Sequence, residues 1–118
     1  MRHSTSKPTK AEQDRLDAIH AMPCIPCEKE RVQQPLRTEA HHLVDKGTRE
    51  HSGGHMATIP MCGWHHRGEP VEYMKRSEMH LIYGPSFALR KREFIACYGT
   101  ERELLALTDE RLKQDQAA

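Results

Sequence analysis

The pattern of apolar and polar residues predicts a helix over residues 10–21. Thr9 and Glu12 have the spacing of a capping box, in which each side chain accepts a hydrogen bond from the other residue's backbone N–H. Ile19 is one of several apolar residues that share one face of this segment. Pro23 ends the segment, because proline lacks the backbone N–H that a helix interior needs.

The second half of the chain returns to helical spacing. One or two short helices are expected first, with Pro70 in a first turn, and Ser86 then predicts the cap of a helix that Gly99 ends. Thr100 and Glu103 form another capping box, which opens a last helix. The apolar residues that we expect these helices to place in the core are Val71, Met74, Leu81, Ile82, Phe87, Phe94, Ile95, Tyr98, Leu104, Leu105, Leu107 and Leu112.

Two short segments between these helical regions have the composition of strands. They span residues 38–44 and 57–61, and the intervening residues 45–55 are rich in glycine, serine and charge. This pattern predicts an antiparallel hairpin. Residues 28–37 are polar and are expected to form a loop. Helices combined with a hairpin predict an α+β fold.

Length and composition predict one small domain. The 118 residues fall below the roughly 150 usually allotted to one domain. Hydrophobic residues make up 36% of the chain, and the total stays below the about 45–50% of a typical soluble domain even when glycine is added. We therefore expect a small core that needs further support. The expected division is a mobile basic tail at residues 1–9, a folded domain at 10–113 and a C-terminal tail at 114–118.

Charge and cysteine content narrow the classes of partner. The net charge of +1 at pH 7 excludes a global positive field, so any basic surface must be local. No apolar run approaches the about 18 residues of a membrane span, and the first residues lack the apolar core of a signal peptide. We therefore expect an intracellular protein with no membrane partner. Four cysteines in a reducing compartment favour metal binding or catalysis over disulfides.

The spacing of the cysteines predicts a structural zinc site. Cys24-x-x-Cys27 and Cys62-x-x-His65 supply four ligands in two pairs, and each spacing lets a turn direct both side chains at one ion. The alternative is a set of buried thiols with surface histidines. A bound zinc ion would add folding free energy to the small core. Cys97 has no partner at ligand spacing and is expected to be a buried structural thiol.

Histidines predict a second kind of site. His41 and His42 are adjacent on an expected strand, so their side chains leave opposite faces unless a bend redirects one of them. His66 stands at the start of an expected helix. Histidines on a first strand and at a helix start suit a metal-dependent phosphodiesterase site. The histidines between positions 41 and 66 are His41, His42, His51, His55, His65 and His66.

At these residues the sequence resembles the HNH (ββα-metal) endonucleases. Zinc-braced members carry CxxC, then an acidic or histidine residue followed by histidine, then CxxCH. The stretches MCGWHHRG, MHLIYGP and YGTERELL further resemble the phage recombination-enhancement (Ref) group of RecA-dependent nucleases. The resemblance covers roughly residues 20–110 and implies a small zinc-braced ββα-metal domain with additional flanking helices. The matching residues are Cys24-x-x-Cys27, His41-His42 and Cys62-x-x-His65-His66.

The resemblance implies a role for each matching residue in the hydrolysis of DNA phosphodiester bonds. His42 corresponds to the general base, and His41 and His66 to ligands of a catalytic Mg²⁺, Mn²⁺ or Zn²⁺ ion. His80 is a candidate third ligand, and Arg67 is a candidate phosphate-binding residue. The four knuckle ligands correspond to the structural Zn²⁺ set. The implied partners are DNA and RecA filaments on single-stranded DNA, in the cytoplasm of a bacterial host, with a phage or prophage as the source.

The sequence departs from the HNH pattern at its middle letter. The chain contains no asparagine, so another residue has to orient the general base. Thr58 and His55, near the start of the second expected strand, are the candidates by position. Within the loop, His51 and His55 are otherwise expected to be ordinary loop residues.

A zinc-stabilised DNA-binding module without catalysis is the alternative reading of the same residues. It needs the zinc knuckle and the basic run Arg90-Lys91-Arg92 on a helix. A zinc-held adaptor for protein interaction is a third reading. Both leave His41, His42 and His66 without a use. The number of metal ions bound separates the classes, since two ions favour the nuclease and one favours the modules.

Overall fold

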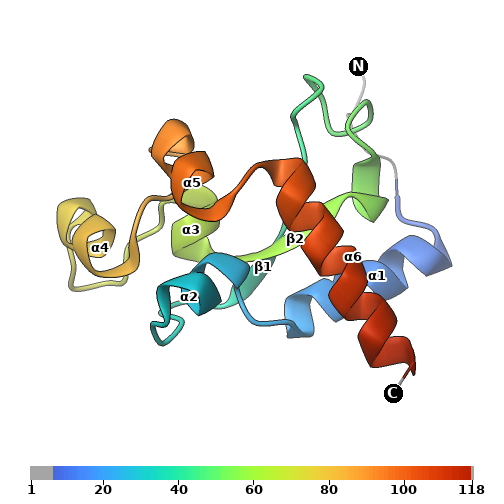
Figure 1. The fold of residues 1–118 in the computed structure, drawn as a ribbon, viewed down its shortest axis with the longest axis horizontal. Helices are drawn as coiled ribbons and strands as arrows, with labels where there is room; N and C mark the ends of the chain where they lie inside the picture. The colour runs from blue at the N-terminus through green and yellow to red at the C-terminus, as the bar shows by residue number, and fades with distance from the viewer. Residues whose placement is uncertain (1–6, 118) are drawn as a thin grey trace.

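A two-stranded hairpin packed among helices forms the centre of the molecule (Figure 1). The computed structural model describes residues 7–117, so most of the expected tail at residues 1–9 lies outside the described residues. The prediction of an α+β fold is confirmed. The elements in chain order are α1 (Lys10–Ala21), α2 (Ile25–Glu30), β1 (Thr38–His42), the 3-10 helix η1 (Gly54–Met56), β2 (Thr58–Cys62), α3 (Gly63–Arg67), α4 (Arg76–Tyr83), α5 (Lys91–Tyr98) and α6 (Glu101–Ala117).

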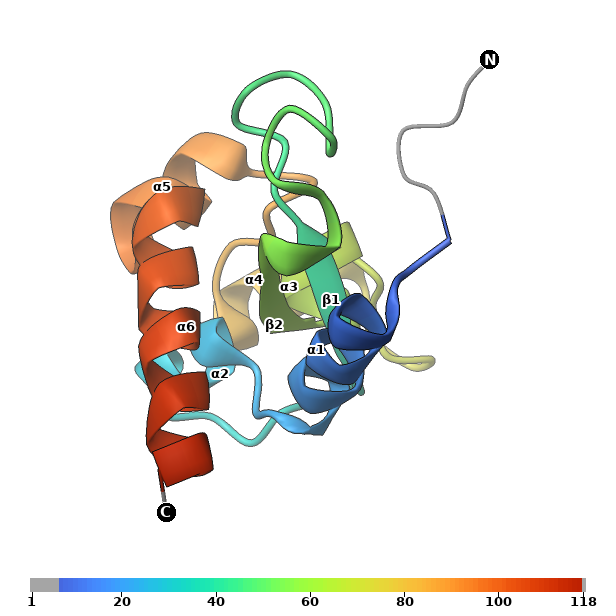
Figure 2. The same ribbon diagram turned by 90° about the vertical axis from the view of Figure 1, so that its right-hand side faces the viewer.

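The hairpin is antiparallel, as its composition predicts. Its register runs from Thr38 opposite Cys62 to His42 opposite Thr58. All five residues of β2 are buried, because α1, α2, α3 and α6 all contact this strand. Figure 2 shows the hairpin lying between α1 and α6. The hairpin is therefore the element against which the helices pack. Strand β1 ends with His41 and His42, and β2 ends with Cys62.

Both predicted capping boxes are confirmed. The backbone N–H of Glu12 donates to Thr9 Oγ1 at 3.2 Å, and that of Thr9 donates to Glu12 Oε1 at 2.8 Å. Glu103 and Thr100 exchange the same two bonds at 3.1 and 2.8 Å. The helix that they open, α6, continues past residue 113, where a tail was expected. None of the helices within residues 7–117 is long and apolar enough to cross a membrane.

Buried apolar residues fall into two clusters. One lies between the hairpin and the helices α2, α5 and α6, and the other surrounds three cysteines beside α3 and α4. The first cluster consists of Ile25, Leu43, Ala57, Ile59, Met61, Phe94, Tyr98 and Leu104. The second consists of Cys24, Cys27, Cys62, Trp64 and Met79.

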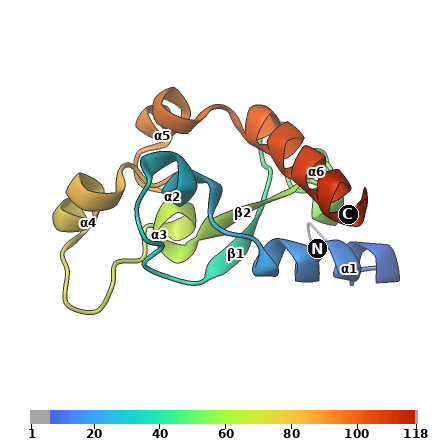
Figure 3. The same ribbon diagram turned by 60° about the horizontal axis from the view of Figure 1, so that its bottom comes forward.

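Expectations for α4 and α5 were partly wrong. Leu81 and Ile82 are 85% and 52% exposed rather than buried. The reason is that α4 lies at one end of the molecule and buries only the face carrying Met79 (Figure 3). Cys97 is exposed, because the buried face of α5 is centred on Phe94 and Tyr98. Helical spacing alone therefore identified these helices but misjudged how much of each surface is covered.

Some expected element boundaries also differ. Part of the expected loop at residues 28–37 belongs to α2, because Pro26 in the first turn and the Cys24 cap start a short helix there. Pro70 lies outside any helix. Ser86 accepts a hydrogen bond from the Leu89 backbone N–H at 3.1 Å, but this closes a turn, and α5 begins only at Lys91.

Candidate active site and metal centre

Three cysteines and one histidine come together where α2, β2 and α3 meet. The ligand atoms of Cys24, Cys27, Cys62 and His65, the Cys3His site, lie within 4.8 Å of one another, and all four residues are buried. His65 Nδ1 is 3.6, 3.4 and 3.5 Å from the three sulfurs in chain order, and the Cys27 and Cys62 sulfurs are 3.8 Å apart. Tetrahedral zinc, with its usual bond lengths, sets about 3.5 Å between nitrogen and sulfur and about 3.8 Å between sulfurs. The site could therefore hold a structural ion such as zinc.

Local structure positions each ligand of the Cys3His site. Cys24 caps α2, and its sulfur accepts a hydrogen bond from the Cys27 backbone N–H at 3.4 Å. Cys62 ends β2, and α3 begins immediately after it, carrying His65. The Nε2 atom of His65 lies 2.8 Å from the Tyr83 carbonyl oxygen, so Nε2 is the donor and Nδ1 keeps its lone pair for an ion. Burial raises the pKa of the Cys24 thiol to about 12, so a nearby cation is needed to hold it as a thiolate.

A second group of side chains lies along β1 and α3. His41 and His66 have ring centroids 5.0 Å apart in an edge-to-face arrangement. The Nε2 atom of His41 is 2.6 Å from Glu101 Oε2, and His66 Nδ1 is 2.8 Å from Glu39 Oε1. Glu39 and His41 project from the same face of the strand because they are two residues apart. Each histidine therefore has one nitrogen on a carboxylate and one nitrogen that remains for another partner.

His42 lies at the end of β1 beside a residue from η1. Its Nε2 atom is 3.0 Å from His55 Nδ1. Burial lowers the pKa of His42 to about 4, and the nearby charge of Arg49 contributes further. His42 is therefore neutral at pH 7 and has a lone pair that can accept a proton. We call His41, His42, His55 and His66, with Glu39 and Glu101, the histidine cluster.

Three buried ring nitrogens near these elements make no hydrogen bond within the part of the chain that the structure describes. They are the Nδ1 atoms of His41, His42 and His80. Buried polar atoms are nearly always paired, so each of these atoms calls for an explanation. Within residues 7–117, however, the Cys3His site is the only group of three or more ligand-type side chains whose ligand atoms lie within 4.8 Å. Among these described residues, the side chains of the histidine cluster do not form such a group.

Comparison with known protein families identifies the chain. The model of the family described as recombination enhancement, RecA-dependent nuclease matches residues 8–113. The chain belongs to this family. No solved structure matches it. The resemblance to the Ref group is therefore confirmed. The family is one of nucleases connected with recombination and RecA.

Arg67 and Thr58 in this RecA-dependent nuclease have partners within the protein. Arg67 donates to Glu39 Oε1 and Oε2 at 2.9 and 2.7 Å, and to Glu69 at 2.5 Å. The Arg67 guanidinium holds the pKa of the Glu39 carboxyl below its usual value. Thr58 accepts a hydrogen bond from Arg15 Nε at 2.9 Å. His55 of η1, the other candidate for orienting the base, makes the contact with His42 instead.

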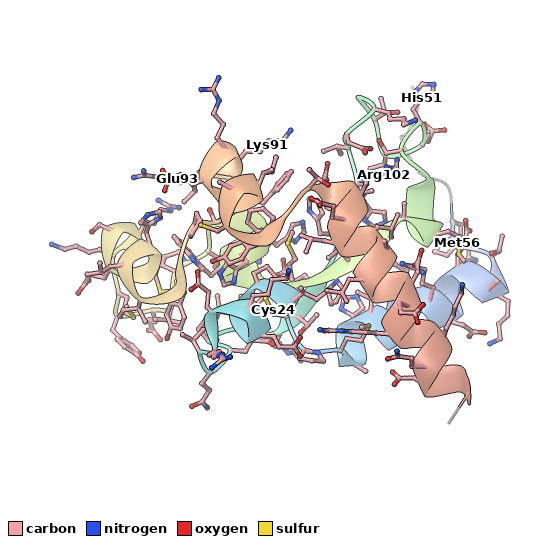
Figure 4. All side chains as sticks on the ribbon, in the orientation of Figure 1. Cys24, His51, Met56, Lys91, Glu93 and Arg102 are labelled. Carbon is pink, nitrogen blue, oxygen red and sulfur yellow. The ribbon has the colours of Figure 1, made fainter. Side chains whose placement is uncertain are left out.

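The two remaining histidines of the sequence analysis lie apart from these contacts. The Nε2 atom of His80 on α4 is 3.5 Å from Glu93 Oε2 on α5. His51 is exposed in the loop between the strands, away from the body of the molecule (Figure 4). Its Nδ1 atom lies 2.8 Å from Thr48 Oγ1. The role of His80 as a metal ligand stays a prediction.

Sequence reasoning missed the two glutamates of the histidine cluster. The position of Glu39 could have been predicted, because a residue two positions before His41 on a strand lies on the same face as His41. That of Glu101 could not, because nothing in the sequence shows that the start of α6 meets β1. The expectation that His41 and His42 leave opposite faces fits their partners, Glu101 for the first and His55 for the second.

Proposed function

We propose that this RecA-dependent nuclease is a metal-dependent HNH endonuclease that hydrolyses DNA phosphodiester bonds. In this proposal His42 is the general base, and His41 and His66 bind the catalytic ion, with His80 as a candidate third ligand. The Cys3His site holds a structural zinc ion. The order of β1, β2 and α3 is the strand, strand, helix order of a ββα-metal domain, which supports the assignment.

One observation carries the proposal: two histidines with adjacent rings each have a carboxylate on one nitrogen. Histidines that bind metal almost always donate their other ring N–H to a carboxylate or a carbonyl. His65 follows this rule in the Cys3His site through the Tyr83 carbonyl. His41 follows it through Glu101, and its buried Nδ1 atom has no hydrogen bond with any residue in the described range 7–117, which suits an atom that binds an ion. His66 follows it through Glu39.

The environment of His42 suits a general base. A neutral ring accepts a proton from water as the water attacks phosphorus. No residue between positions 7 and 117 donates a hydrogen bond to the Nδ1 atom and so competes for its lone pair. His55, 3.0 Å from Nε2, is positioned to orient the ring in place of the missing asparagine. A divalent ion, when bound, lowers the pKa of water and neutralises charge on the phosphate oxygens, which compensates for a weak base.

The substrate and partners follow from the family. Its description supports DNA as the substrate and RecA, assembled on single-stranded DNA, as a partner. We further propose that the protein acts in the cytoplasm of a bacterial host and is encoded by a phage or prophage. The basic run Arg90-Lys91-Arg92, which is the N-cap and the first two residues of α5, is exposed and offers positive charge to DNA phosphates, although Arg90 also pairs with Glu93.

Plasmid cleavage tests the proposal. Purified protein is incubated with supercoiled DNA and Mg²⁺, Mn²⁺ or Zn²⁺, with and without RecA filaments on single-stranded DNA. We expect nicked or linear products from the native protein and a loss of about 10²–10⁴-fold in His42→Ala, the usual contribution of a general base. The matched control is His51→Ala, which removes an exposed histidine of the same region and should cleave normally.

The result that overturns the proposal is equally definite. If a folded native protein binds one metal ion and cleaves DNA under none of these conditions, the zinc-stabilised DNA-binding module becomes the better assignment. Equal cleavage by the native protein and His42→Ala would reject His42 as the base. Cleavage that does not depend on RecA would leave the HNH assignment in place and remove the RecA filament as a partner.

A further inference from the structure

We infer that Glu101, the first residue of α6, is a positioning residue that holds His41 in the one tautomer able to bind the catalytic ion. The inference rests on the proposed function, since it assumes that His41 is a metal ligand. It adds a residue far along the chain, outside the ββα elements, to the machinery of the active site.

The contact between the two side chains is short and buried. Glu101 Oε2 lies 2.6 Å from His41 Nε2, and each side chain is only 5% exposed. The same oxygen accepts a hydrogen bond from the Val44 backbone N–H at 3.2 Å. The carboxylate is thus held by two donors from the segment that ends β1 and follows it. Little water reaches the pair to compete with these bonds.

A carboxylate at this position decides which ring nitrogen carries the proton. Glu101 Oε2 already accepts a hydrogen bond from the Val44 backbone N–H, so it faces His41 as an acceptor and the His41 nitrogen beside it carries N–H. In a neutral ring the other nitrogen, Nδ1, then carries a lone pair. The Nδ1 atom is buried and has no hydrogen-bond partner among the described residues. A proton on Nδ1 would be a buried donor without an acceptor, which is costly, whereas a lone pair there is ready to bind an ion.

Hydrogen bonds with neighbouring residues hold the start of α6 in position. Arg102 donates to both carboxylate oxygens of Asp45 at 2.6 and 3.0 Å and to the Ser52 carbonyl at 2.9 Å. The capping box of Thr100 and Glu103 begins the same helix. Glu101 is therefore presented to His41 by a rigid element rather than by a flexible loop.

A role limited to stabilising the fold would not require the buried nitrogen on the far side of the ring. A purely structural histidine would be expected to use both nitrogens, as buried polar atoms generally do. In the Cys3His site, the same arrangement occurs at His65, with the Tyr83 carbonyl in place of Glu101. The comparison assigns Glu101 to preparing a metal ligand.

Cobalt binding tests the inference without relying on activity. Protein loaded with zinc at the Cys3His site is titrated with Co²⁺, and binding is followed by visible absorption. The sulfur-to-cobalt charge-transfer band in the near ultraviolet reports any exchange at the cysteines. We expect Glu101→Gln and Glu101→Ala to weaken Co²⁺ binding by about 10–100-fold, the usual effect of losing a partner of a ligating histidine. Circular dichroism and retained zinc show that each variant is folded.

Two further measurements complete the test. Glu110→Gln, an exposed glutamate farther along α6, is the matched control and should bind Co²⁺ like the native protein. Nuclear magnetic resonance of ¹⁵N-labelled histidine, before cobalt is added, should find His41 protonated at Nε2 in the native protein. In Glu101→Gln a form protonated at Nδ1 should appear, because an amide can donate as well as accept.

Each outcome is decisive. Unchanged affinity and an unchanged His41 tautomer in both folded Glu101 variants would overturn the inference while leaving the proposed nuclease intact. A native protein that binds no second ion and cleaves no DNA would remove the proposed function, and this inference with it. Should Glu101→Ala fail to fold, Glu101→Gln, which keeps the shape and one acceptor oxygen, decides the question alone.

Discussion

The Cys3His site and the proposed catalytic site in the histidine cluster surround their histidines differently. In the first, four buried ligand atoms lie at the separations of a tetrahedral ion, so protein atoms would fill the whole coordination sphere of an ion bound there. In the second, two histidines backed by carboxylates stand side by side, and no other side chain among the described residues completes a set of three. A closed site contributes to folding, whereas an open one leaves positions for water and substrate.

The groups that contact the histidines of the two sites also differ, in their charge. His65 of the closed site contacts a neutral backbone carbonyl, whereas His41 and His66 of the proposed open site contact the carboxylates of Glu101 and Glu39. Negative charge next to a ligand raises its basicity and strengthens binding where few protein ligands are present. The comparison predicts that losses at the closed site reduce stability and that losses at the open site reduce metal binding.

Removing a ligand from the closed site should have the largest effect. Cys62→Ser is expected to be mostly unfolded at 25 °C, since structural zinc contributes about 10–16 kcal/mol of apparent affinity in short domains. That amount matches or exceeds the about 5–15 kcal/mol by which most proteins are stable. Circular dichroism and a thermal melt, with and without a zinc chelator for the native protein, measure the loss.

A second cysteine provides the control for this experiment. Cys97 is exposed and lies outside the Cys3His site, so Cys97→Ser should melt like the native protein. A Cys62→Ser variant that melts at the native temperature would show that the closed site does not support the fold.

The sequence predicted the Cys3His site better than the histidine cluster, because the two sites depend on contacts at different separations along the chain. The Cys3His site was predicted in full, because each ligand pair is set by a turn of two residues and only one contact between the turns is needed. The capping boxes at Thr9 and Thr100 were predicted for the same reason, since their partners are three residues apart. The spacing of residues along the sequence is therefore enough to predict these features.

Features that depend on packing between distant segments could not be predicted. His41 and Glu101 are joined only because α6 packs against β2 and brings its first residue to the end of β1. The exposure of Leu81 likewise follows from where α4 lies in the molecule and not from its apolar character. The roles of the individual histidines stay predictions until the variants are measured.

A smaller effect is expected from the hydroxyl group beside the closed site. Tyr98 donates to Glu30 Oε2 at 2.5 Å, and its oxygen is 3.4 Å from His65 Nε2. Tyr98→Phe should lower the free energy of unfolding by about 1–3 kcal/mol, because partly buried acceptors lose their donor. Cleavage by the folded fraction should stay at the native level, unlike in Glu101→Gln. Tyr73→Phe removes a hydroxyl from a tyrosine that is 86% exposed and should change neither quantity.

The tyrosine comparison separates stability from catalysis. Urea unfolding followed by tryptophan fluorescence gives the free energy, and plasmid cleavage gives the activity. A large loss of cleavage in folded Tyr98→Phe would contradict the division of labour between the two sites.

The ion pair at the start of α6 should have the smallest effect, and that effect should depend on pH. Arg102 lowers the pKa of Asp45 below its usual value of 3.8, so the pair stabilises the fold above about pH 4 and loses this contribution as the pH falls through the lowered pKa. At pH 7 Asp45→Asn should melt no more than about 2–3 °C below the native protein, since the pair is partly exposed to solvent. As the pH falls below the lowered pKa of Asp45, the two melting temperatures should converge. Glu50→Gln, in the same exposed loop, serves as the control. A loss of cobalt affinity in Asp45→Asn as large as in Glu101→Gln would mean that the surface pair, and not the buried carboxylate, positions His41.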